Sequence, residues 1–198
     1  FAIIPAAQVL DHIEALRAVS DTWLALKFGS EKAFALGAFD PAYLCNFDHA
    51  VLRHNETGRI ASFATLLRGG TGAEVAIDLM RYDPATTPSA MDGLFADMMI
   101  WARDAGYTWF SLGAAPLAGL ENRKHAPVWN RVGGFIYTHG ERFYKFEGLR
   151  SFKQKFDPFW SPNYLASPGR LDAARTLYEV SNLISGGVTG VMRRKRDQ

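Results

Sequence analysis

Three consecutive stretches decide the fold: EVAIDLMRYDP at 74–84, SAMDGLFADMMIWARDAG at 89–106 and YTWFSLG at 107–113. The first and third are apolar runs that predict strands. The second spaces its apolar residues as on one helix face, with Ser89 placed to cap its start and Gly106 to end it. A strand, a helix and a further strand in succession form a crossover, which the right-handed rule favours as a parallel pair.

The segments around this crossover supply the rest of the predicted elements. Residues 7–28 carry apolar side chains at helical spacing and predict an amphipathic helix. The segments 43–53 and 59–69 flank the turn HNETG, so they predict a hairpin that 74–82 extends to a meander. The remaining predicted elements are a strand pair over 133–140 and 142–149 and a helix over 170–185.

This order of elements indicates an α+β fold, with a mixed, mostly antiparallel sheet flanked by helices. The sequence shows no internal repeat, low-complexity linker or break in composition, which argues against a second domain. We therefore expect residues 1–28 to form a leading helix or linker and residues 29–198 to form one domain.

The composition is that of an ordinary globular chain. Of 198 residues, 48% are hydrophobic and 21% charged, and the apolar runs are interrupted well before the roughly 20 residues that would span a bilayer. Cys45 is the only cysteine, so an internal disulfide is excluded and a reducing compartment is favoured. Because the first residue is Phe1 and no signal sequence precedes it, we expect a piece of a longer protein.

Positive charge is concentrated late in the chain, although the net charge is only +2. The stretch from Arg123 to Lys155 holds eight cationic residues against Glu141 and Glu147, and Arg193–Arg196 adds four more. Such clusters suit an anionic partner such as phosphate, although a solvated face and a disordered tail explain them as well.

Asp78 is the one charged residue in the middle of an apolar strand. Burying a carboxylate requires a partner, so it pairs either with a structural arginine or with a cationic substrate group. Arg81 lies three positions on, which places it on the opposite strand face unless a bulge intervenes. The residues alone favour the structural ion pair. The five histidines show no i, i+4 pair, so no metal site is predicted.

The strand order resembles the GNAT acyltransferase fold, and three stretches narrow the likeness further: EVAIDLMRYDP, GYTWFSLGAAPLAGL and YKFEGLRSFKQKFDPFWSPNYLA. They resemble the C-terminal domain of phosphatidylglycerol lysyltransferases and alanyltransferases, the multiple peptide resistance factor family, from about Trp23 to Ala166. Members carry an N-terminal membrane region followed by a cytosolic part with two GNAT-like halves. The resemblance implies that this chain is the second half, at the cytosolic face of the bacterial membrane, and leaves homo-oligomerisation open.

The resemblance implies transfer of an aminoacyl group, with lysyl favoured and alanyl possible, from aminoacyl-tRNA to phosphatidylglycerol, which modifies membrane charge and resistance to cationic antimicrobial peptides. Among the residues, it assigns catalytic roles to Asp78, Arg81 and Lys153, and it favours the substrate amine as the partner of Asp78. Candidate substrate-binding residues are Tyr144, Arg150, Lys155 and Glu179. A helix over GLRSFKQKF that merely turns its lysines to water is the alternative for Lys155.

No metal, coenzyme A or other cofactor is expected. Acetyl-CoA enzymes of this fold hold pyrophosphate on the amides of a glycine-rich turn after the fourth strand. Here that turn contains Pro84 and Pro88, which lack amide hydrogens, and Asp83 and Asp92, which repel phosphate. Two alternative functions stay open: transfer from aminoacyl-tRNA to peptide precursors of the cell wall, and a non-catalytic module that binds RNA or membranes.

Overall fold

The structure is a computed structural model that describes residues 1–26, 39–86, 89–115 and 146–164. It divides into two compact units, one containing Phe1–Ser111 and the other Leu112–Asn163. Each unit is described separately below. No helix in the described ranges is long and apolar enough to cross a membrane.

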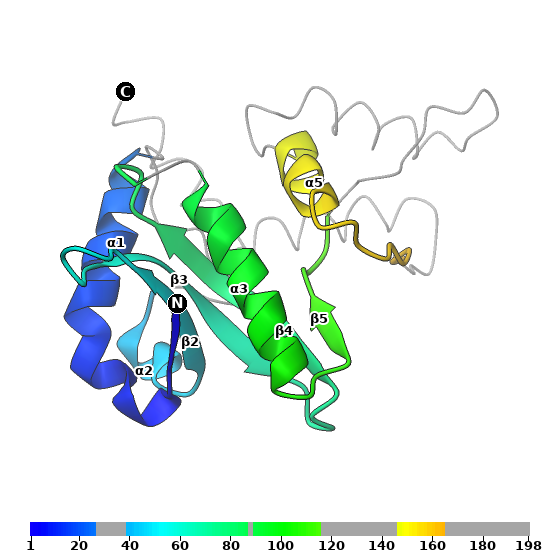
Figure 1. The fold of residues 1–198 in the computed structure, drawn as a ribbon, viewed down its shortest axis with the longest axis horizontal. Helices are drawn as coiled ribbons and strands as arrows, with labels where there is room; N and C mark the ends of the chain where they lie inside the picture. Colours follow the sequence, from blue (N-terminus) through cyan, green and yellow to red (C-terminus); the bar gives the residue numbers. More distant parts are fainter. Residues whose placement is uncertain (27–38, 87–88, 116–145, 165–198) are drawn as a thin grey trace, which may run out of the picture. The chain divides into compact units, whose positions relative to one another are not determined.

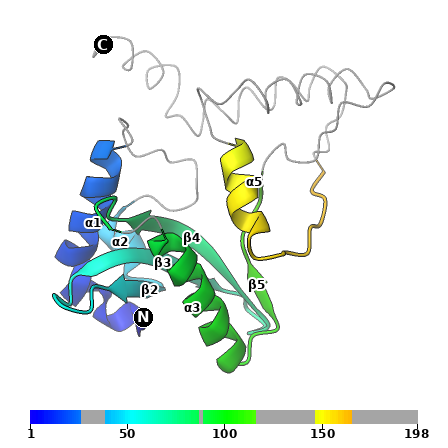
Figure 2. The ribbon, with the colours of Figure 1, turned by 45° about the horizontal axis from the view of Figure 1, so that its top comes forward.

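The first unit is built on a five-stranded sheet whose spatial order equals its chain order (Figure 1). The strands are β1 (Ala2–Ile4), β2 (Asp48–Arg53), β3 (Ile60–Arg68), β4 (Glu74–Tyr82) and β5 (Trp109–Ser111). The first four are antiparallel neighbours, and β5 runs parallel beside β4 (Figure 2). The meander and the parallel crossover predicted from the sequence are therefore confirmed, and with them the α+β class with a mixed, mostly antiparallel sheet.

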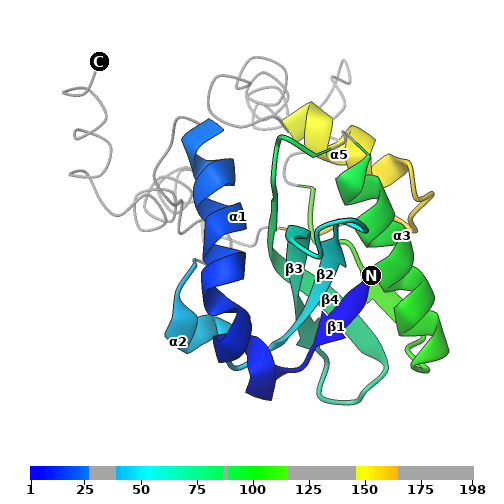
Figure 3. The same ribbon diagram turned by 60° about the vertical axis from the view of Figure 1, so that its left-hand side comes forward.

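Helices cover both faces of this sheet. In order along the chain, the helices of this unit are the 3-10 helix η1 (Ala6–His12), α1 (Ile13–Leu26), the short α2 (Pro41–Leu44) and α3 (Ala90–Asp104). Helix α1 contacts β3 and β4 on one face, and α3 contacts β2, β3 and β4 on the other (Figure 3). Gly106 adopts a positive φ of 88° just after α3, which is the left-handed conformation expected at a helix end.

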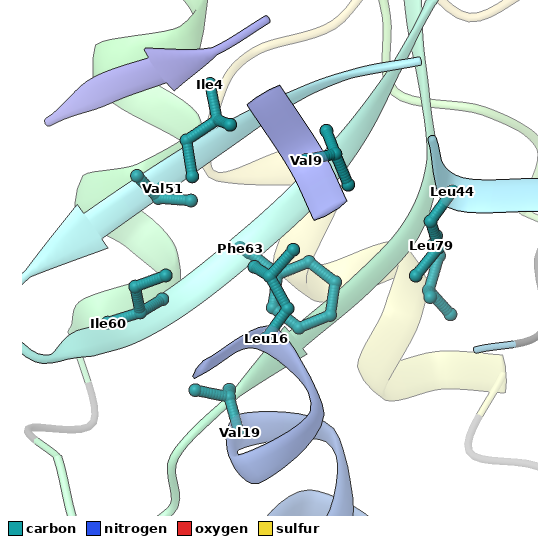
Figure 4. Close-up of a cluster of buried hydrophobic side chains, with 9 residues drawn as sticks. All are labelled: Ile4, Val9, Leu16, Val19, Leu44, Val51, Ile60, Phe63 and Leu79. Carbon is teal, nitrogen blue, oxygen red and sulfur yellow. The ribbon is translucent and has the colours of Figure 1, made fainter. Parts of the chain in front are cut away.

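The core under α1 fixes which strand residues face this helix. Leu16 and Val19 of α1 lie against Phe63 of β3, and Leu79 of β4 belongs to the same buried cluster (Figure 4). Full burial of each large apolar side chain contributes roughly 1.5–3 kcal/mol. Because Phe63 pairs directly with Arg81 across the antiparallel ladder, Arg81 lies on this same face.

Several predicted boundaries were wrong. The strand predicted over 43–53 begins only at Asp48, because Asp40 accepts a hydrogen bond from the amide of Ala42 and Pro41 starts the short helix α2. The helix predicted over 7–28 is α-helical only from Ile13, and β1 was not predicted at all. Ser89 precedes α3, but its side chain makes no capping hydrogen bond.

Residues 1–26 supply β1, η1 and α1, and they place Val9, Leu16 and Val19 in the core of the sheet unit. This leading segment therefore contributes core packing to the sheet that carries Asp78.

The second unit contributes helix α5 (Phe146–Gln154). The strand predicted over 142–149 is therefore wrong from residue 146 on, whereas the helical stripe predicted in GLRSFKQKF is confirmed as far as Gln154. The predicted strand over 133–140 and the predicted helix over 170–185 lie outside the described residues.

Candidate active site

A β-bulge in β4 shapes the region around Asp78. Ala64 of β3 pairs with Met80, but Leu66, two residues on, pairs with Ile77, three residues back. Strand β4 therefore carries one extra residue, and Asp78 and Leu79 together lie opposite Thr65. The spacing placed Asp78 and Arg81 on opposite faces unless a bulge intervened, and such a bulge is present.

The bulge places Asp78 and Arg81 on the same face of the sheet. Asp78 Oδ2 accepts a hydrogen bond of 2.9 Å from the hydroxyl of Tyr43, whose ring packs against the core under α1. Arg81 turns to the same side, where its guanidinium carbon lies 4.2 Å from the centroid of the Trp23 ring of α1. An odd separation of three residues thus brings both charged side chains to the face that α1 covers.

Asp78 is half-buried, and its partner is a tyrosine rather than an arginine. Within the described ranges it forms no ion pair, so the structural ion pair favoured by the residues alone is not found there. Burial, together with the hydrogen bond to Asp78 and its negative charge, raises the pKa of Tyr43 to about 12. The phenol therefore keeps its proton near neutral pH and acts as a donor to the carboxylate.

Arg81 is buried, with 8% of its surface exposed. Its Nη1 donates a hydrogen bond of 2.9 Å to the carbonyl of Met80, and its guanidinium stacks on Trp23. Stacking of this kind is worth more when the cation is withdrawn from water. Arg81 thus joins β4 to α1, a contact the sequence does not reveal because 58 positions separate the two residues.

A buried histidine also lies on this face, and sequence reasoning missed its role. His49 is fully buried; one ring nitrogen lies 2.9 Å from the carbonyl of Phe47 and the other 3.2 Å from the hydroxyl of Thr65. Burial lowers the pKa of His49 against the opposing effects of Phe47 and Asp48. A neutral ring donates to the carbonyl and accepts from Thr65, so His49 fixes the β3 residue opposite the bulge.

Lys153 is the notable charged group of the second unit. Its side chain is almost fully buried, with 4% exposed, and Nζ donates a hydrogen bond of 2.7 Å to the carbonyl of Ala114. Gly113 adopts a φ of 72°, a left-handed conformation that few other residues tolerate, immediately before this carbonyl. Burial lowers the pKa of Lys153 to about 8, so near neutral pH a measurable fraction is a neutral amine.

The other predicted substrate-binding residues divide into two groups. Arg150 and Lys155 border an open hollow of α5, together with Ser151 and Gln154. Arg150 lies over Trp160 and Lys155 over Phe152, at 5.6 and 5.3 Å from the ring centroids. Tyr144 and Glu179 lie outside the described residues.

The turn after β4 uses its amides internally. The side chain of Asp83 accepts a hydrogen bond from the amide of Ala85, and its carbonyl accepts one from the amide of Thr86. The amide of Asp83 itself donates to Ala61. These three donors of the turn are therefore engaged within the protein.

The family model "Phosphatidylglycerol lysyltransferase, C-terminal" matches residues 1–167 of this chain. The chain belongs to this family. A curated phosphatidylglycerol lysyltransferase of Bacillus subtilis is 37% identical over 173 residues, which are 87% of this chain and 20% of that protein. One from Staphylococcus aureus is 32% identical over 165 residues, 83% of this chain and 19% of that protein.

Two solved structures agree with this assignment. The structure of L-PGS from Bacillus licheniformis shares 34% identity at a TM-score of 0.76, covering 93% of this chain and 55% of that chain. A C-terminal domain from Agrobacterium fabrum, assigned in its description to lysylphosphatidylglycerol synthetase, shares 43% identity at a TM-score of 0.77, with 94% and 55% covered. The chain therefore spans about a fifth of the curated relatives and about half of the solved chains.

Proposed function

We propose that this chain is a catalytic half of an enzyme that transfers an aminoacyl group, with lysyl favoured over alanyl, from aminoacyl-tRNA to phosphatidylglycerol. The observation that carries the proposal is the Asp78 carboxylate, held at the β4 bulge by a neutral hydroxyl in a chain of this family. A carboxylate that no arginine of the described residues neutralises keeps its negative charge for a cation. The donor's α-ammonium group is such a cation.

The proposed reaction is a transesterification. A glycerol hydroxyl of the lipid attacks the ester carbonyl that joins the amino acid to tRNA, the ester bond to the tRNA ribose breaks, and the hydroxyl proton passes to the departing ribose oxygen. Asp78 orients the donor through its ammonium group. Arg81, stacked on Trp23, keeps β4 in place against α1 and adds positive charge on this face of the sheet.

Lys153 is proposed to act on the reacting groups rather than on peripheral phosphate. A lysine with a pKa of about 8 has a neutral fraction that can accept a proton from a hydroxyl, and it returns that proton as an ammonium group. Arg150 and Lys155, which border the open hollow of α5, are proposed to bind phosphate of lipid or tRNA.

The proposed enzyme uses no coenzyme A and no metal. The turn after β4 supports the first point, because three of its described amides, those of Asp83, Ala85 and Thr86, already donate hydrogen bonds within the protein. We further propose that the protein acts at the cytosolic face of the membrane, with a preceding GNAT-like half and a membrane region. The greater length of the relatives supports additional domains.

A lipid product assay tests this function. The full-length protein is incubated with phosphatidylglycerol vesicles and with lysyl-tRNA or alanyl-tRNA, and the lipids are separated by thin-layer chromatography. We expect an aminoacylated, more positively charged lipid, formed faster with lysyl-tRNA. Transfer to a cell-wall peptide precursor instead of lipid, or binding of tRNA without any transfer, would overturn the proposal.

A further inference from the structure

Tyr43 occupies a position that several contacts fix. Helix α2 begins at Pro41, is capped by Asp40, and inserts the fully buried Leu44 into the core. The Tyr43 ring itself packs against Phe47, with centroids 4.9 Å apart. Contacts with the core and with Phe47 hold the ring, so its hydroxyl is directed at one place.

That place is a single oxygen of Asp78. The hydroxyl donates to Oδ2 at 2.9 Å, across 35 positions of sequence. A carboxylate offers about four lone-pair sites, so this one bond leaves Oδ1 and a second site on Oδ2 to other donors. A neutral donor also leaves the charge of the carboxylate in place, which an arginine at the same position would offset.

We infer that Tyr43 is a positioning residue, which orients the Asp78 carboxylate so that its remaining lone pairs receive the α-ammonium group of the aminoacyl donor. This inference rests on the proposed role of Asp78. Without the hydroxyl, the carboxylate group of Asp78 rotates about its Cβ–Cγ bond. A smaller fraction of its orientations then allows a hydrogen bond to the ammonium group. Tyr43 then contributes to recognition of the donor, whereas the lipid acceptor is unaffected.

The test compares Tyr43→Phe with Tyr107→Phe in the full-length protein. Tyr43→Phe removes only the hydroxyl and keeps the ring that packs on Phe47. Tyr107 is a matched control, because it is a half-buried tyrosine of the same unit whose ring packs on Trp101, at 5.8 Å between centroids. Steady-state rates are measured with lysyl-tRNA and with Nα-acetyl-lysyl-tRNA, which lacks the α-ammonium charge, and thermal unfolding checks that both variants fold.

For Tyr43→Phe we expect KM for lysyl-tRNA to rise about tenfold, the loss typical of one hydrogen bond to a charged group. The KM for lipid should stay unchanged, and the preference for lysyl-tRNA over its acetylated form should fall by about the same factor. Tyr107→Phe should behave as wild type in all three measurements.

Two results would overturn the inference: wild-type KM and preference in Tyr43→Phe, or an equal loss with both donors, which indicates a structural role alone. The same assay on Asp78→Asn distinguishes a failure of the proposed role of Asp78 from a failure of the inference about Tyr43. If Asp78→Asn keeps wild-type turnover, the proposed function of Asp78 fails. If Asp78→Asn is inactive and Tyr43→Phe is wild type, only the inference about Tyr43 fails.

Discussion

The β4 bulge of the sheet unit and helix α5 of the second unit each position an ionisable side chain, but they do so by different means. Asp78 is half-buried and receives a side-chain hydroxyl from Tyr43. Lys153 is almost fully buried and reaches only the backbone carbonyl of Ala114 among the described residues. The first arrangement supplies a hydrogen-bond donor to a charged group, whereas the second withdraws a charged group from solvent.

This difference indicates two kinds of work. A carboxylate whose hydrogen-bond donor is neutral gains no compensating positive charge from that donor, so it suits recognition of a cation. A desolvated lysine changes its protonation near neutral pH and suits proton transfer. Variants of Asp78 and Lys153 test this contrast between a carboxylate that binds a cation and a lysine that transfers a proton.

The largest effect is expected from Asp78→Asn, which removes the fixed charge and keeps the shape of the side chain. Transfer should fall by at least about 100-fold, since the ammonium group of the bound donor would lose its charged partner, and such a loss costs several kcal/mol. Thermal unfolding should show a folded protein. The control is Glu74→Gln, an exposed carboxylate at the start of the same strand, which should keep wild-type turnover. A folded Asp78→Asn variant with wild-type turnover would refute the contrast.

Lys153→Ala and Lys155→Ala should differ in which kinetic constant they change. With saturating lipid and tRNA, Lys153→Ala should lose about 100-fold in turnover, the usual contribution of a general acid or base. Lys155 is exposed, so its alanine variant should keep turnover and weaken binding, with the salt dependence flattened by roughly one unit of slope. Equal, wild-type turnover and unchanged salt slopes would show that neither lysine contributes to transfer or to binding.

A smaller effect concerns stability and pH. The pKa of Lys153 falls from 10.5 to about 8 on folding, so between these values the unfolded chain binds more protons than the folded one. Stability of the wild type should therefore rise from pH 8 to 10.5 relative to Lys153→Met, which has no titrating group there. Urea unfolding across this range checks the difference. Parallel pH profiles for the two proteins would show that burial does not perturb Lys153.

The last prediction is that coenzyme A does not bind. Isothermal titration of coenzyme A into the wild-type protein should give no binding heat. The turn after β4 contains Pro84, and its Ala85 and Thr86 amides are bound to Asp83, so it offers pyrophosphate few donors. Wild-type protein with micromolar affinity for coenzyme A would contradict this and would favour an acyl-CoA donor.

The regular elements were predictable because apolar periodicity reports them directly. The meander, the crossover helix and the parallel strand all follow from residues 43–113. The spacing of Asp78 and Arg81 left open whether they share a face, and the bulge in β4 decides it. The start of β2 was misplaced because a four-residue helix is too short to show a period. Capping at Asp40 and Pro41 was the signal available for it.

The partners of the charged residues could not be predicted in the same way. Tyr43 meets Asp78 across 35 positions, and Trp23 meets Arg81 across 58, because the sheet brings separate segments together. Periodicity describes one segment at a time and carries no such information. The lowered pKa of Lys153 likewise depends on its burial in the folded chain, which the cationic residues beside it in the sequence do not indicate.

The extra residue in β4 also bears on which sequence changes the strand tolerates. Both flanks of the bulge already pair regularly with β3, so a one-codon deletion at 78 or 79 would leave an unbroken ladder and shift no other residue. The deletion would remove one of two neighbouring residues that have different roles. Leu79 packs in the core, with 1% exposed, and Asp78 is available to a ligand. After such a deletion a single position would face Thr65. A protein with the shortened strand would therefore keep either the core side chain or the carboxylate at this position, but not both.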